Sequence, residues 1–341
     1  MIISNMNMYV QRKNKIDHYL LLWLIVVLIL VFFMVIIGGI TRLTDSGLSM
    51  IEWRPLYGIL PPLGHEEWNR VFKLYKNSPE YIYYNKGMNL SEFKFIFFWE
   101  FFHRLFGRII GVVFIVPFIY FAIKKYLSKN ILLKLIIIFF FGFLQGIIGW
   151  WMVESGLSKD PYISQYRLTL HLGNAFFIMF LLVWLIMDLR EGFTRIKFNL
   201  GLLTLLILVF TILAGAFVAG MDAGLMYNTY PLMNGNFFPD QYLELGIFDP
   251  FENPGSAQFH HRHLGLFSLL VIFYFYYKNF NNKMVKYRLN FLIFLIIVQF
   301  GLGIFILNKF VPVPLASLHQ IGAMIIFILL TTIIHTQNRD S

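Results

Sequence analysis

Long apolar stretches separated by short charged connections are the feature that most constrains the fold of this chain. A helix of about 20 mainly apolar residues crosses the hydrocarbon core of a bilayer. Charged residues make up only 13% of the chain, about half of the share that is usual in soluble domains. The sequence therefore predicts an all-α integral membrane protein with eight transmembrane helices, at about 19–40, 95–123, 131–153, 168–188, 199–220, 258–277, 289–308 and 314–335.

Basic residues gather in alternate connections, which predicts the orientation of these helices. Residues 1–18 and the connections 124–130, 190–197 and 278–288 are basic and fall on one side of the membrane. The positive-inside rule places them, and both termini, in the cytoplasm of a bacterial cell with the chain in its inner membrane. We read 1–18 as a cytoplasmic tail before a retained first span. The net charge of +10 then reports topology and indicates no nucleic acid partner.

The two long outer connections differ in character. The first begins with "GGITRLTDSGL" at 38–48, continues to about residue 93 and contains "HEEWNRVFKLYK" at 65–76, which predicts a short amphipathic helix. The second, 221–257, contains no Lys or Arg. Connections as long as the first, without structure of their own, are uncommon in compact proteins, so we expect the first to be ordered and more than a connector.

The absence of cysteine limits the chemistry of the chain. It excludes disulfides, thiolate haem ligands, Cys-ligated iron–sulfur clusters and covalent attachment of c-type haem. The nine histidines are then the natural metal ligands.

Four matches in the same order indicate an internal repeat. "HRLFG" at 103–107 returns as "HRHLG" at 261–265, "GGITRLTDSGL" resembles "GAFVAGMDAGL" at 215–225, and "LQGIIG" at 144–149 resembles "VQFGLG" at 298–303. His171 pairs with His319. Each half has four spans, so we expect parallel repeats that form two pseudo-symmetric four-helix bundles, 19–190 and 191–341.

Each half supplies two histidines at the outer ends of its second and fourth spans. These are His103 and His171 in the first half, and His261 and His319 in the second. Facing imidazoles in a bundle suit the two axial positions of a haem iron. The alternatives are interfacial histidines that reach toward lipid headgroups, and a zinc site, which normally needs four ligands.

Glu100 distinguishes the halves, because its counterpart in the repeat is Gln258, which cannot ionise. Glu100 could be a structural carboxylate that hydrogen-bonds a histidine, or a proton-transferring group, and we favour the second. Arg104 and Arg262 could anchor span ends or pair with haem propionates. The first half has no counterparts of His260 and His263, so we expect these to be loop or haem-edge residues.

Seven segments in order make the chain resemble the haem A synthase family, in the cysteine-free branch of alpha-proteobacteria and mitochondria. They are "GGITRLTDSGLS", "EFKFIFFWEFFHRLFGR", "QGIIGWWMVESGL", "YRLTLHLGNA", "GAFVAGMDAGLMYNTYPLMNG", "ENPGSAQFHHRHLG" and "PLASLHQIGA". One departure is His260, where the family commonly has Asp, which leaves an alternative ligand beside His261.

The resemblance implies a function for each half. The family oxidises the C8 methyl group of haem O to a formyl group, by successive hydroxylations, to give haem A. By motif position, His103 and His171 would flank the substrate haem O, and His261 and His319 would ligate a haem b cofactor near the periplasmic side. Glu100 would be the carboxylate beside the substrate. The implied partners are the membrane haem O synthase and an electron acceptor, while a homo-oligomer is left open.

Two rival classes make different predictions. A bis-His diheme cytochrome that only transfers electrons predicts symmetric halves and no use for a lone Glu100. A transporter built from parallel repeats predicts helix-breaking Gly or Pro residues near mid-membrane, and Pro117 is the one proline that lies inside an expected span and not at its first residue.

Overall fold

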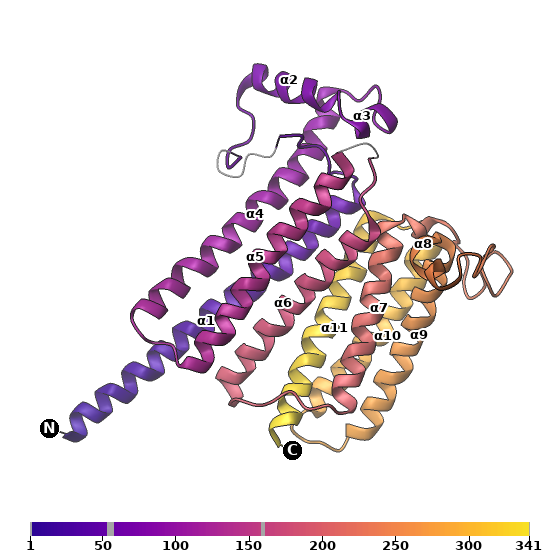
Figure 1. The fold of residues 1–341 in the computed structure, drawn as a ribbon. Coiled ribbons are helices and arrows are strands. Elements are labelled where there is room, and N and C mark those ends of the chain that lie inside the picture. The colour runs from indigo at the N-terminus through magenta and orange to yellow at the C-terminus, as the bar shows by residue number, and fades with distance from the viewer. Residues whose placement is uncertain (1, 53–57, 158–160, 341) are drawn as a thin grey trace.

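The computed structural model of the chain describes residues 2–52, 58–157 and 161–340. Apart from one isolated bridge between Met233 and Asn236, the regular structure in these ranges is helical, which confirms the all-α class. Eight of the described helices have 21 or more residues and run side by side (Figure 1). They are α1 (Ile2–Leu43), α4 (Leu90–Ile123), α5 (Lys129–Leu157), α6 (Gln165–Glu191), α7 (Leu200–Gly220), α9 (Pro254–Asn279), α10 (Lys286–Asn308) and α11 (Val313–Asp340).

Within the described ranges, seven helices are long and apolar enough to cross a membrane. The chain is therefore a multi-pass membrane protein. The span expected at 258–277 lies in α9, which is not among the seven. The polar segment from His260 to His263 and the tyrosines near the other end of α9 lower its hydropathy.

Several helices extend beyond the bounds expected from apolarity. The helix α1 continues to Leu43, so 41–43, expected to lie in the first outer connection, are helical. The helix α4 begins five residues earlier than expected, where the Asn89 side chain accepts hydrogen bonds from the Ser91 and Glu92 amides and Glu92 accepts one from the Asn89 amide. Such a reciprocal cap fixes a helix start with polar residues, which an apolarity pattern does not mark.

The helices α6 and α11 form the centre of the molecule. The helix α6 contacts α1, α5, α7 and α11, and α11 contacts α1, α6, α7 and α10. Where they meet, the rings of Phe176 and Phe327 pack edge to face with centroids 5.1 Å apart. Met179, Leu182 and Leu330 have no exposed surface. The two central helices join the first four long helices to the last four in one core.

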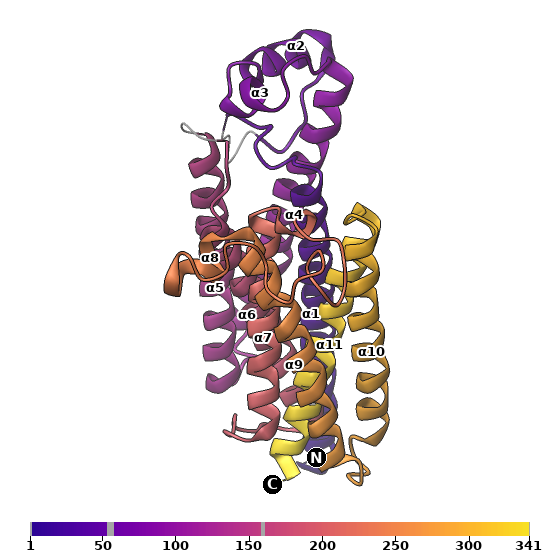
Figure 2. The same ribbon diagram turned by 90° about the vertical axis from the view of Figure 1, so that its right-hand side faces the viewer.

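The short helices lie in the two outer connections. The helix α2 (Gly64–Tyr75) confirms the short helix that the pattern at 65–76 predicts. Together with α3 (Pro79–Tyr83), it covers the start of α4. The second connection holds η1 (Ala223–Leu225), η2 (Gly246–Phe248) and α8 (Asp249–Glu252) beside the start of α9. Both connections lie at the end of the molecule opposite to the chain termini (Figures 1 and 2).

Candidate functional site

The first histidine pair lies between the helices of the first half. His103 is on α4 and His171 on α6, and the two imidazoles are close enough to interact electrostatically. Each ring lies against a glycine of an adjacent helix. A Cβ built on Gly38 of α1 would come within 3.2 Å of His103 Nε2, and one on Gly149 of α5 within 3.0 Å of His171 Cε1. The glycines therefore leave the space that each imidazole occupies.

The second pair has the same construction. The rings of His261 on α9 and His319 on α11 lie with their centroids 6.4 Å apart and their planes at 83°. A Cβ on Gly215 of α7 would come within 2.9 Å of His261 Cε1, and one on Gly303 of α10 within 3.1 Å of His319 Cε1. The two backing glycines take the repeat positions of Gly38 and Gly149.

Hydrogen bonds orient histidines of both pairs. His261 Nδ1 lies 3.1 Å from the carbonyl oxygen of Thr211, which can only accept, so Nδ1 carries the proton and Nε2 has a free lone pair. Gln145 and Gln299 donate to the backbone carbonyls of His171 and His319 at 3.0 and 2.8 Å. Such outer contacts orient histidines that bind metal.

The donor set fits a haem iron in each half. Among the described residues, the Nδ1 atoms of His171 and His319 are buried without a hydrogen-bond partner, which is costly unless a ligand is bound nearby. The described residues contain no cluster of three or more His, Asp or Glu side chains that could hold a metal ion. Two imidazoles from facing helices can supply both axial ligands of a haem iron.

Glu100 lies three residues before His103 on α4 and is only 2% exposed. Its Oε2 atom accepts hydrogen bonds from Ser49 Oγ at 2.7 Å and from the Met50 amide at 2.8 Å, and its Oε1 atom pairs with Arg104. The carboxylate therefore connects α4 to the outer connection after α1. The partners of its oxygens are all donors, as an ionised carboxylate needs.

Gln258 takes the equivalent place in the second half with reversed hydrogen bonding. Its Nε2 atom donates to the Gly224 and Tyr227 carbonyls at 3.2 Å, and its Oε1 atom accepts from Arg262 at 3.1 Å. Both halves thus use an acid or amide with an arginine four residues later to hold the outer connection. Only the first half places an ionisable group there.

Arg104 and Arg262 bind the outer connections in this structure. Arg104 donates to the Met50 carbonyl at 3.5 Å, and Arg262 donates to the carbonyls of Thr229 and Tyr227 at 3.0 and 2.6 Å. These contacts correspond to the anchoring interpretation. Pairing with propionates stays a prediction.

His260 and His263 face away from the second pair, toward the second outer connection. His263 packs on Phe259 with ring centroids 4.0 Å apart, and His260 lies 5.9 Å from the ring of Tyr242. The structure brings His261 to His319 and not these two neighbours.

Sequence reasoning overlooked the backing glycines and Ser49. The alignment of the halves contained a signal for the glycines, because it pairs Gly38 with Gly215 and Gly149 with Gly303. It also overlooked Arg42, whose guanidinium donates to Asp45 at 2.8 Å and to Asp222 at 2.7 Å. Arg42 thus joins equivalent turns of the two halves. No local pattern predicts that contact, since Asp222 lies 180 residues away along the chain.

Taken together, the fold and these residues define a multi-pass helical membrane protein with two glycine-backed histidine pairs. Comparison with known proteins gives the family. Residues 21–331 match the COX15–CtaA model, described as a cytochrome oxidase assembly protein, so the chain belongs to this family. Proteins named haem A synthase are similar over most of their length. The one from Nitrosospira multiformis is 42% identical over 340 residues, covering 95% of both chains. The one from Maricaulis maris is 43% identical over 327 residues, 93% of this chain and 95% of the relative.

Proposed function

We propose that this chain is a haem A synthase that oxidises the C8 methyl group of haem O to a formyl group by successive hydroxylations. The activity follows from the family and from the names of the relatives. The observation that supports the assignment of roles is an asymmetry: two similar histidine pairs are present, and only in the first is a buried carboxylate, Glu100, three residues before one of the histidines.

We further propose that the chain consists of two parallel four-helix bundles, 19–190 and 191–341, with α9 as the eighth span. The helix contacts support this division. In the first half α1 contacts α4 and α6, and α5 contacts α4 and α6; in the second half α7 contacts α9 and α11, and α10 contacts α9 and α11. Between the halves, α6 contacts α7 as α11 contacts α1. Such reciprocal contacts are expected of a pseudo-two-fold axis along the membrane normal.

The first pair, His103 and His171, would hold the substrate haem O, and the second pair, His261 and His319, would hold haem b. When bound, haem b supplies one-electron transfer. The residues around it fix its ligands: Thr211 sets the tautomer of His261, and Gly215 and Gly303 admit the two rings. Electrons from the oxidation would leave to an acceptor outside the chain.

Glu100 would handle protons in the substrate half. Conversion of a methyl group to a formyl group with water as the oxygen source releases protons together with electrons, and a carboxylate near the substrate can accept the protons. Ser49 and the Met50 amide hold Oε2 of Glu100 in a fixed position near α4. Gln258 cannot take this role in the second half, which agrees with a half that carries electrons only.

The orientation proposed from the basic connections places both histidine pairs toward the periplasm of a bacterial inner membrane. The connections 124–130, 190–197 and 278–288 lie at the same end of the bundle as the termini (Figure 1). The membrane haem O synthase would deliver the substrate within the bilayer.

Expression of the full chain together with a source of haem O tests this function. Pigments are extracted from purified protein and separated by chromatography. A haem A synthase yields a formyl-bearing haem in addition to haem b. A protein that holds only haem b, with haem O unchanged, would instead be a diheme cytochrome, and a protein without haem would contradict both readings.

A further inference from the structure

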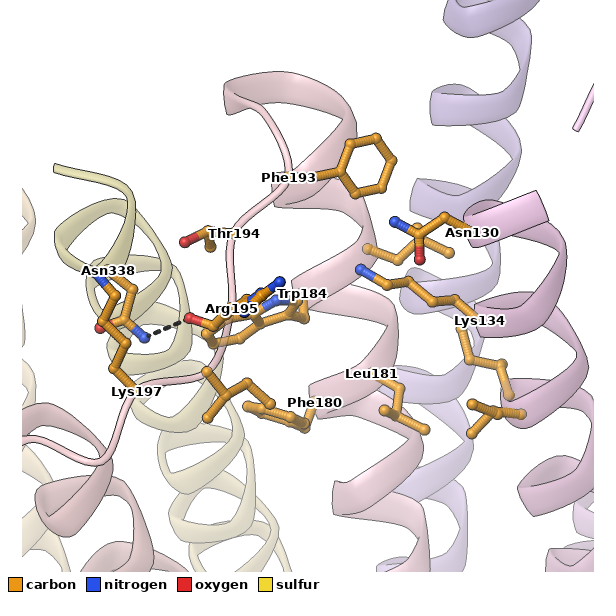
Figure 3. A pocket seen from close by; sticks show the side chains of 14 residues that line it. Asn130, Lys134, Phe180, Leu181, Trp184, Phe193, Thr194, Arg195, Lys197 and Asn338 are labelled. Carbon is orange, nitrogen blue, oxygen red and sulfur yellow. Dashed lines mark hydrogen bonds between the residues drawn. The ribbon is translucent and has the colours of Figure 1, made fainter. Parts of the chain in front are cut away.

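A pocket of about 730 Å³ lies at the terminal end of the bundle, far from the histidine pairs. It is bordered by α5, α6, α11 and the connection 192–199 (Figure 3). Trp184 in its wall follows His171 by 13 residues along α6, which corresponds to about 20 Å at the helical rise. The pocket is therefore separate from the proposed haem sites.

The side chains of the pocket combine cations with an apolar floor. Its cations are Lys134, Arg195 and Lys197, and no acidic residue is among the described residues that line it. The floor is apolar and includes Phe180, Leu181 and Trp184. A ligand that satisfies both parts is an amphiphile with an anionic head and a hydrocarbon chain.

The polar end of the pocket is held by a buried ionic cluster. Asp188, which is 2% exposed, pairs with Lys134 and accepts from His335 Nε2 at 3.0 Å. The Thr194 amide donates to the same carboxylate at 3.2 Å and fixes the connection above the pocket. Asn338 Nδ2 donates to the Arg195 carbonyl at 3.3 Å on the other side, as the dashed line in Figure 3 marks. The ion pair with Asp188 thus holds the Lys134 ammonium group at the edge of the pocket.

The connection also has the composition of a segment at a membrane surface. Phe193, Ile196 and Phe198 are 50%, 52% and 85% exposed and alternate with the two basic residues. Apolar side chains beside Lys and Arg are typical of segments at the level of lipid headgroups. The pocket therefore opens where phospholipid phosphates lie.

We propose that this pocket binds one anionic phospholipid, with its headgroup phosphate at Arg195, Lys197 and Lys134 and an acyl chain along the face of α6 that carries Leu181 and Trp184. The site is distinct from the haem sites, so the proposal does not depend on the identity of the haems. The lipid would join α5 and α6 of the first half to α11 of the second.

Quenching of Trp184 fluorescence by lipids with brominated acyl chains tests this proposal. The full chain in detergent is titrated with brominated phosphatidylglycerol or brominated phosphatidylcholine, and Trp184→Phe identifies the contribution of Trp184. We expect phosphatidylglycerol to quench this contribution at a lipid concentration about tenfold lower than phosphatidylcholine. In Arg195→Gln/Lys197→Gln, binding of phosphatidylglycerol should weaken about 30-fold, since each cation near a lipid surface contributes about fivefold.

The matched control is Lys283→Gln/Lys286→Gln, which removes two exposed cations from another connection at the same end. It should leave the quenching of Trp184 unchanged. Equal quenching by both lipids, or an equal loss in the control, would overturn the proposal. So would displacement of the lipid by glycerol phosphate or by free haem at the same concentration, because the occupant would then be a free phosphate or a haem.

Discussion

The ring of His261 fits directly against Gly215, where an added Cβ would lie 2.9 Å from Cε1 of the imidazole. Gly215→Ala should therefore displace His261 and weaken the binding of haem b about tenfold, in the range of overpacking costs. Haem b per protein, measured from the pyridine haemochrome spectrum, checks this. Gly301→Ala on α10 is the control, because its Cβ would meet no atom within 4 Å. Equal haem b in the two variants would contradict the role of Gly215.

Gly149 makes the equivalent prediction for the first half. Its added Cβ would lie 3.0 Å from Cε1 of His171, whereas one on Gly146 would meet nothing within 4 Å. We expect Gly149→Ala to reduce haem A formation several-fold while haem b stays at the wild-type level, and Gly146→Ala to change neither. Loss of haem b in Gly149→Ala would show that the halves do not hold their haems separately.

Glu100→Gln should stop the reaction without unfolding the protein. The amide resembles Gln258, which already forms hydrogen bonds with the arginine four residues later in the second half. We expect haem b to be retained and haem A formation to fall at least 100-fold, as removal of a proton-transferring group does. Ser49→Ala keeps the carboxylate and should retain part of the activity. Wild-type conversion of haem O by Glu100→Gln would exclude the proposed role.

The outer cap formed by α2 and α3 should lose stability as the pH rises. Burial raises the pKa of Glu80 from 4.5 to about 7, although Tyr75 donates a hydrogen bond to it at 2.9 Å. Between these two values the folded cap binds more protons than the unfolded chain, so the stabilisation present at low pH is lost by about pH 7.

Glu80→Gln should remove this pH dependence and stabilise the cap at pH 8 by about 3 kcal/mol, since the pKa rises from 4.5 to about 7 and each unit of pKa corresponds to about 1.4 kcal/mol. Hydrogen exchange of the α2 and α3 amides at pH 5 and pH 8, corrected for the intrinsic rates, measures the difference. Glu66→Gln, on the exposed face of α2, should behave like the wild type. A cap that is equally stable at both pH values in the wild type would refute the prediction.

The sequence predicts those parts of the site that recur in the repeat. His103 and His261 share a motif, and both pairs lie on the helices where the alignment places them. Apolarity also locates the long helices, but it misses ends that polar caps define, as at Asn89. Apolarity also fails to mark α9 as a candidate span, because its segment around His261 is polar.

Contacts between distant segments could not be predicted, because they depend on how the helices and the outer connections pack together in space. Ser49 and Glu100 are 51 residues apart along the chain, and His335 and Asp188 are 147 residues apart. Neither pair has a spacing that a helix or strand would produce. The ionic cluster around Asp188 includes His335, and it forms because α6 and α11 pack against each other.

The most direct test of the two-haem account compares His171→Ala with His319→Ala in the full chain, each expressed with a source of haem O. Haem b, haem O and haem A are measured per protein after extraction. His65→Ala serves as the control, because the side chain of His65 on α2 is exposed. We predict that His171→Ala keeps haem b but forms no haem A, and that His319→Ala loses haem b. Loss of the same pigments in the same proportion from both variants would contradict the assignment of different haems to the two halves.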